Sequence, residues 1–230
     1  MGDNKIVSGF ETFDEVTNGF HNGELIVIGG RPAMGKTTLA ISLAKNIIQK
    51  QIKTVVFISL ELSATQLLKR LSISVDVEQL QQIQNNKLFI QDAPNNDVAG
   101  ITSYLTAIKT NSTFDLIIID YFQLLKDEPK NALIELKQIA LKFEVPIILL
   151  SQLSKDADTR KGDHKPIIAD LLDVNVNKDA MDSVYFLYRP SYYKLSLDAT
   201  MLKMIVAKLR GEAVTFEINL QWDFNTYQIF

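Results

Sequence analysis

The sequence predicts an α/β fold with a mostly parallel sheet, helices on both faces and an antiparallel C-terminal extension. Over most of the chain, short apolar runs of strand length alternate with segments whose apolar residues recur at helical spacing. Continuous apolar strands are buried on both sides, as in a parallel sheet that helices cover. Near the C-terminus, apolar and polar residues alternate with a period of two, which is typical of an antiparallel strand with one solvent-facing side.

The first elements are the clearest. Residues 25–29 (LIVIG) form an apolar run that predicts a buried strand, and residues 37–49 follow with the apolar spacing of a helix. Residues 54–60 (TVVFISL) predict the next strand. Ser63 and Gln66 then form a capping box, which predicts the start of another helix.

The alternation continues through the middle of the chain. Residues 88–90 predict a short strand and residues 101–108 a helix. Residues 116–120 (LIIID) predict a strongly buried strand. A helical apolar face follows over 132–143, and residues 145–151 (VPIILLS) predict another strand.

The C-terminal third has a different character. Residues 184–188 and 201–207 are strand-like, and residues 214–220 alternate as an antiparallel strand does. The polar stretch 154–165 has no helical period and predicts a mobile loop. Because no repeat or long linker divides the sequence, we expect residues 1–230 to form one domain.

The composition excludes several classes of protein. The chain has 230 residues, no Cys and a net charge of −3. Without Cys there is no disulfide scaffold, thiolate zinc site or cysteine nucleophile. The net charge is not that of a protein that coats nucleic acid by bulk attraction. No apolar run approaches the roughly 18 residues of a membrane span, and residues 1–5 do not begin a secretory signal. We therefore expect a cytoplasmic protein with no membrane contact.

Residues 30–37 (GRPAMGKT) match the P-loop pattern G-x-x-x-x-G-K-[ST] between a predicted strand and a predicted helix. In such a loop, backbone N–H groups and the helix N-terminus surround phosphate oxygens. Lys36 is expected to reach the β- and γ-phosphates, and the Thr37 hydroxyl to bind Mg²⁺. The predicted nucleotide-binding residues are consecutive: Gly30, Arg31, Pro32, Ala33, Met34, Gly35, Lys36, Thr37 and Thr38.

Three polar residues at strand ends could complete this site. Asp120 can hold the metal ion, or simply make a turn at the end of its strand. Glu61 can orient and deprotonate the attacking water, or lie as a plain acid near a helix start. If the strands that carry the P-loop, Glu61 and Asp120 are neighbours, both carboxylates face the γ-phosphate. Gln152 can bind the γ-phosphate or cap its strand, and the residues alone do not decide between these.

Other conspicuous side chains need no functional role. His21 and His164 have no partner at metal-ligand spacing. Trp222, Phe224 and Tyr227 follow an amphipathic strand, and we expect edge-strand packing of these rings rather than stacking on bases.

Several segments in the same order resemble the RecA-like motor domain of DnaB-type replicative helicases. They cover nearly the whole chain, and the ordered set is more specific than the P-loop alone. The matching segments are SGFETFD at 8–14, TNGF at 17–20, GRPAMGKT at 30–37, SLEL at 59–62, IDYFQL at 119–124, LSQL at 150–153, FLYR at 186–189, YY at 192–193 and AKLR at 207–210.

This resemblance implies roles for particular residues. Glu61 matches the catalytic glutamate, Asp120 the aspartate that supports the metal ion, and Gln152 the γ-phosphate sensor. Lys208 and Arg210 match the basic pair that the family inserts into the next subunit's ATP site. Without the resemblance, this pair would be same-face residues near the end of a solvated strand. The implied cofactors are ATP and Mg²⁺, and the implied partners are single-stranded DNA and like subunits in a hexameric ring.

The sequence also departs from the family pattern. Only seven residues precede Ser8, so we expect no separate N-terminal helicase domain. Residues 126–131 are short where the family has a longer basic loop. Residues 172–175 (LDVN) replace the family's Arg-Glu-Ser-Gly in a loop that touches DNA. The predicted ATP site is intact, while the DNA-facing segments are eroded.

The favoured function is an ATP-hydrolysing helicase motor that moves along single-stranded DNA during replication. The alternative is a stand-alone RecA-type regulatory or loader ATPase without unwinding activity. A third possibility is a non-catalytic nucleotide-binding partner of other helicase subunits. The presence of Lys36, Glu61 and Arg210 argues against this third possibility.

Overall fold

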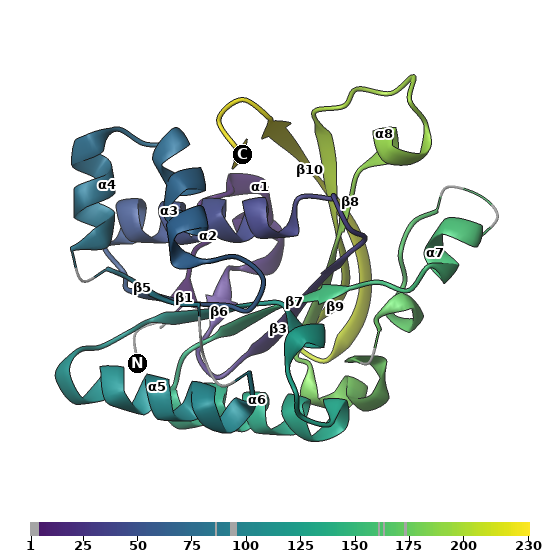
Figure 1. Cartoon of the computed structure of the whole chain (residues 1–230). Helices are drawn as coiled ribbons and strands as arrows, with labels where there is room; N and C mark the ends of the chain where they lie inside the picture. The colour runs from purple at the N-terminus through teal and green to yellow at the C-terminus, as the bar shows by residue number, and fades with distance from the viewer. Residues whose placement is uncertain (1–4, 86, 93–95, 161, 163, 173) are drawn as a thin grey trace.

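The computed structural model describes residues 5–85, 87–92, 96–160, 162, 164–172 and 174–230. The prediction of no secretory signal rests partly on residues 1–4, and the comparison of residues 172–175 includes Asp173. Both lie outside the described residues. Within the described part of the chain, a nine-stranded sheet has the order β11-β10-β9-β8-β3-β7-β6-β4-β5 (Figure 1). A separate two-stranded sheet pairs β1 (Lys5–Ile6) with β2 (Phe20–His21).

Strands β8, β3, β7, β6, β4 and β5 are consecutive in the sheet and all run parallel, which confirms the predicted mostly parallel sheet. Apolar side chains fill these strands, and most are buried on both sides, as their unbroken apolar sequences predict. The parallel strands are β3 (Leu25–Gly30), β4 (Val55–Ser59), β5 (Leu88–Gln91), β6 (Leu116–Asp120), β7 (Ile147–Gln152) and β8 (Ser183–Tyr188).

The C-terminal strands form the predicted antiparallel extension. β9 (Met201–Leu209) pairs antiparallel with β8 and with β10 (Glu212–Asp223), which pairs with β11 (Gln228–Ile229). In β10, Ile218 and Leu220 are buried while the residue between them faces solvent. β8 joins the two parts of the sheet, because it pairs parallel with β3 and antiparallel with β9.

Helices cover both faces of the sheet, and each face has its own buried core (Figure 1). One face packs against α1 (Glu11–Thr17), α2 (Lys36–Gln51), α3 (Ala64–Ile73) and α4 (Val77–Gln84). The other face packs against α5 (Val98–Asn111) and α6 (Pro129–Phe143). Short helical turns complete the chain: η1 (Phe122–Leu124), α7 (Asp156–Thr159), η2 (Ile168–Asp170), η3 (Val174–Ala180) and α8 (Pro190–Tyr193). In the described part of the chain, no helix is long and apolar enough to cross a membrane.

Local sequence signals explain where the helices start. At α3, Ser63 Oγ accepts the Gln66 N–H at 3.2 Å, and Gln66 Oε1 accepts the Ser63 N–H at 2.9 Å, so the predicted capping box is confirmed. At α6, Glu128 caps the first turn and Pro129 takes the N-terminal position that suits it.

The strands that carry the P-loop, Glu61 and Asp120 are not all adjacent, because β7 lies between β3 and β6, and β4 lies beyond β6. The condition under which both carboxylates were expected to face the γ-phosphate is thus met only for β4 and β6. The stretch 154–165 is not a plain loop, since it contains α7. Within that stretch, Arg160 forms an ion pair with the buried Asp170.

Candidate functional site

The P-loop lies between the end of β3 and the start of α2, at the edge of the sheet where the parallel strands end. A cavity of about 290 Å³ opens there. It brings most of the predicted P-loop side chains together with Glu61 and Gln152. The lining residues are Pro32, Ala33, Gly35, Lys36, Thr37, Thr38, Glu61, Arg70, Tyr121, Gln152, Trp222 and Tyr227.

The loop curls because two of its residues have left-handed backbone angles. Ala33 has a φ of 63° and Gly35 a φ of 93°. Packing at Gly35 is also tight, since a Cβ would lie 3.0 Å from Cζ3 of Trp222, and a positive φ of this size strains any residue but glycine. This requirement explains the glycine at the N-cap of α2, where N–H groups are unpaired and attract anions.

Lys36 is the main buried cation of the cavity. Its Nζ donates to the carbonyl oxygens of Gly30 at 2.7 Å and Arg31 at 3.2 Å. Burial lowers the pKa of Lys36 to about 8, although the charges of Asp120 and Glu61 favour its protonated form. An ammonium group that is desolvated to this degree is prepared to bind phosphate oxygens.

Asp120 connects the end of β6 to the P-loop. Its Oδ2 accepts a hydrogen bond from Thr37 Oγ1 at 2.7 Å. Asp120 is 1% exposed, and this burial raises its pKa to about 6. The hydrogen bond from Thr37 lowers the pKa of Asp120, and the negative charge of Glu61 raises it. Its Oδ1 is buried with no hydrogen-bond partner among the described residues.

This unpartnered oxygen bears on metal binding. A buried carboxylate oxygen without a donor is costly unless a cation or a water bound to it is present. The described residues contain no group of three or more His, Cys, Asp or Glu that could hold a metal ion. The Thr37 hydroxyl and the unpartnered Oδ1 of Asp120 could hold a Mg²⁺ ion whose other ligands are phosphate and water oxygens, as Mg²⁺ prefers.

Glu61 reaches the cavity through the pairing of β4 with β6. The two strands place Ser59 opposite Asp120, and the Leu60 N–H donates to the Asp120 carbonyl at 2.7 Å. Ser59 Oγ donates to the Leu62 carbonyl at 2.6 Å and so fixes the turn that carries Glu61. Glu61 is exposed and lines the cavity.

Gln152 is the last residue of β7, and its backbone lies beside Gly30 in the parallel pairing with β3. Its side chain lines the cavity. The end of β7 is held instead by Gln123, whose Oε1 accepts the Gln152 N–H at 3.0 Å and whose Nε2 donates to Ser151 Oγ at 2.9 Å. The Gln152 side chain also shares a hydrogen bond with Tyr121, another residue that lines the cavity.

Sequence reasoning missed several residues of the cavity. Arg70 comes from α3, and its charge favours the ionised form of Asp120. Tyr121 follows Asp120 directly, within the IDYFQL segment that could have indicated it. Trp222 packs beside Phe224, with ring centroids 4.5 Å apart, and it also lines the cavity. The expected edge-strand position was wrong, because β11 pairs with β10 at Trp222. No local sequence signal places Arg70 or Trp222 at the cavity.

Lys208 and Arg210 do not line the cavity. Lys208 Nζ donates to the carbonyls of Lys178 at 2.8 Å and Met181 at 2.7 Å. Arg210 was expected near the end of a strand. It lies instead in the turn between β9 and β10, where it has a φ of 47° and is followed by Gly211.

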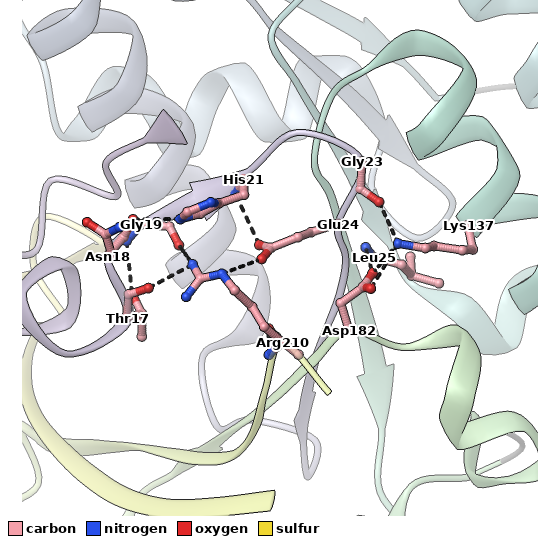
Figure 2. A network of polar contacts seen from close by, with 11 residues as sticks. Thr17, Asn18, Gly19, His21, Gly23, Glu24, Leu25, Lys137, Asp182 and Arg210 are labelled. Carbon is pink, nitrogen blue, oxygen red and sulfur yellow. Dashed lines mark hydrogen bonds and ion pairs between the residues drawn. The ribbon is translucent and has the colours of Figure 1, made fainter. Parts of the chain in front are cut away.

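Arg210 is held within its own chain (Figure 2). Its Nη2 donates to the carbonyls of Thr17 at 2.8 Å and Gly19 at 3.0 Å, and its Nε lies 2.7 Å from Oε1 of the buried Glu24. Glu24 directly precedes β3, so Arg210 lies at the edge opposite the P-loop. Figure 2 shows a second ion pair beside it, between Lys137 and Asp182 at 2.7 Å.

Comparison with known proteins identifies similar chains. The family model described as "DnaB-like helicase C terminal domain" matches residues 5–78 and 73–229. The chain is 31% identical to "Replicative DNA helicase DnaB" of Geobacillus stearothermophilus, over 96% of this chain and 56% of that protein. It is 30% identical to "Replicative DNA helicase DnaC" of Bacillus subtilis, with the same two coverages. The chain thus spans about half the length of these relatives.

Solved structures agree with this match. A structure described as an ATPase domain superposes with a TM-score of 0.85 at 26% identity, over 99% of this chain and 92% of that chain. "The Structure Of A DnaB-Like Replicative Helicase And Its Interactions With Primase" superposes with a TM-score of 0.86 at 26% identity, over 97% of this chain and 61% of that chain.

Proposed function

This chain belongs to the DnaB-like helicase C-terminal domain family, and on that premise we propose that it binds and hydrolyses ATP with Mg²⁺ as a motor acting on single-stranded DNA in the cytoplasm. One observation carries the proposal. Lys36, Thr37 with Asp120, Glu61 and Gln152 come from separate parts of the chain and meet at one cavity. A nucleotide-binding turn alone would not require the two carboxylates and the glutamine.

Each of these residues has a distinct part in hydrolysis. The backbone N–H groups of the P-loop and Lys36 bind the β- and γ-phosphates. Thr37 and Asp120 would hold Mg²⁺, which neutralises phosphate charge when bound. Glu61 accepts a proton from the attacking water, and Gln152 donates a hydrogen bond to the γ-phosphate.

The position of Arg210 supports the proposal that it serves a neighbouring subunit. Arg210 and Lys208 lie at the sheet edge opposite their own P-loop, so within one chain they cannot stabilise the charge that develops on the transferred phosphoryl group. A head-to-tail arrangement of like subunits would bring this edge to the next chain's cavity, and such interfaces form a ring when the rotation between subunits closes. We propose that the subunits form a hexameric ring, in which Arg210 supplies a cation in trans.

Contact with DNA would depend on local groups. With a net charge of −3, the chain gains little from bulk attraction to phosphates, so a few basic side chains must make the contacts. The relatives described above are named replicative helicases, and none of them favours the alternative of a stand-alone regulatory or loader ATPase.

Replacement of Lys36 by Ala should abolish ATP binding, because it removes the buried cation that faces the phosphates. Equilibrium dialysis with ATP and Mg²⁺ measures this directly. Trp222, the single Trp of the chain, lines the cavity and gives an independent fluorescence signal. Lys50→Ala is the matched control, since Lys50 lies at the far end of the same helix.

The wild-type chain should also hydrolyse ATP, and single-stranded DNA should raise the rate. Equal ATP affinity in Lys36→Ala and wild type would contradict the nucleotide site. An ATP hydrolysis rate that is the same with and without single-stranded DNA would contradict the proposed substrate and favour the stand-alone ATPase.

A further inference from the structure

The side chain of Arg31 belongs to the P-loop segment but does not line the cavity. Its Nη1 donates to the Leu153 carbonyl at 2.9 Å, and its Nη2 donates to Asp158 Oδ2 at 2.5 Å. The Arg31 side chain is only 12% exposed. Leu153 directly follows Gln152, so this guanidinium joins the P-loop to the chain just beyond the glutamine.

Asp158 lies in α7 and uses both carboxylate oxygens. Oδ2 accepts from Arg31, and Oδ1 accepts the hydroxyl of Tyr193 in α8 at 2.7 Å. Burial alone would raise the pKa of Asp158, but the Tyr193 hydrogen bond and the Arg31 charge outweigh it and hold the pKa below its ordinary value. The carboxylate is therefore ionised at neutral pH, and its bond to Arg31 is charge-assisted.

Tyr193 is itself fixed by packing. Its ring stacks against His164 with centroids 4.6 Å apart and an interplanar angle of 15°, and against Tyr188 with centroids 5.8 Å apart. Because the hydroxyl that holds Asp158 has little freedom to move, the Arg31–Asp158 pair is anchored to the sheet through Tyr188 of β8.

These contacts act where the strand ladder ends. The pairing of β3 with β7 runs from Leu25 opposite Ile147 to Gly30 opposite Gln152. Beyond that point, the described residues show no further ladder pairing between the P-loop and β7. Arg31 supplies the next connection, one residue further along each chain segment.

We propose that Arg31 and Asp158 are positioning residues for ATP hydrolysis, which hold the P-loop against the segment after Gln152. This clamp rests on the proposed function. It keeps the Gln152 side chain opposite Lys36 at the distance that a bound γ-phosphate requires. Neither side chain of the clamp lines the cavity, so we expect its loss to affect the geometry of the reaction and to leave phosphate binding by the backbone of the P-loop in place.

Asp158→Asn tests the clamp because it removes the charge while the shape is kept. We expect kcat for ATP to fall by about 10- to 100-fold, the effect of a displacement near 1 Å, with the Kd for ATP unchanged. Asp156→Asn is the matched control, since Asp156 is an exposed aspartate of the same helix whose side chain bonds Ser154. Asp158→Glu, which restores the charge, should recover part of the lost rate.

Thermal unfolding of each variant separates positioning from loss of structure. If Asp158→Asn does not fold, Tyr193→Phe removes one hydrogen bond from the same carboxylate and should still lower kcat without changing Kd. A kcat equal to that of Asp156→Asn would overturn the clamp while the wild type remains an ATPase. A weaker Kd with unchanged kcat would overturn it as well, because the pair would then serve binding. A wild-type chain without ATPase activity would contradict the proposed function itself, and the clamp with it.

Discussion

Arg210→Ala should bind ATP normally and hydrolyse it about 10³- to 10⁵-fold more slowly than wild type, the usual loss for a cation supplied in trans. Arg210 lies at the edge of the sheet opposite its own P-loop, so it can act only on a neighbour's γ-phosphate. To bind Arg210, that phosphate must displace the Thr17 and Gly19 carbonyls from Nη2 and the Glu24 carboxylate from Nε. Steady-state ATPase rates at several protein concentrations measure the effect.

The neighbouring ion pair provides the control for Arg210→Ala. Lys137→Met breaks the pair with Asp182 at the same edge of the sheet and leaves a carboxylate without its cation, as Arg210→Ala does. We expect Lys137→Met to affect thermal stability but to keep most of the ATPase activity. Equal losses of activity in both variants would show that this edge has a structural role only.

Glu61→Gln should bind ATP like wild type but turn it over at least about 10²-fold more slowly, because the amide cannot accept the proton of the attacking water. Single-turnover hydrolysis measures the chemical step, and a nucleotide-binding titration verifies that affinity is kept. Glu78→Gln, an exposed carboxylate of α4 outside the cavity, is the control. Turnover near the wild-type rate would mean that the catalytic carboxylate lies elsewhere.

The local elements could be predicted because their signals lie within a few residues. The capping box of Ser63 and Gln66 sets the start of α3, and the run 116–120 becomes β6. The helix α4 was missed although Asp76 and Gln79 form a second capping box before it. α7 has only four residues and no apolar period, so nothing in its sequence indicates a helix.

The order of the strands could not be predicted in the same way. Apolar runs identify strands, but the crossover through each helix decides which strands become neighbours. β7 therefore lies between β3 and β6, and β8, which is buried at every position as the neighbouring parallel strand β3 is, pairs parallel with β3.

In the candidate site too, residues with local sequence signals could be predicted, while contacts between distant segments could not. Lys36, Thr37, Glu61, Asp120 and Gln152 follow from motifs at strand ends, and the structure brings them together. The direction of the Arg31 side chain depends on Asp158, 127 residues further along the chain, which no local pattern reveals.

The central claim is that the ATP site is shared between neighbouring subunits, and one mixing measurement tests it most directly. In a mixture of Arg210→Ala and Glu61→Gln chains, some interfaces combine an intact Glu61 with an intact Arg210. We predict that the mixture hydrolyses ATP faster than either variant does alone. A rate equal to the weighted mean of the two variants, together with concentration-independent turnover by a wild-type monomer, would contradict the shared site.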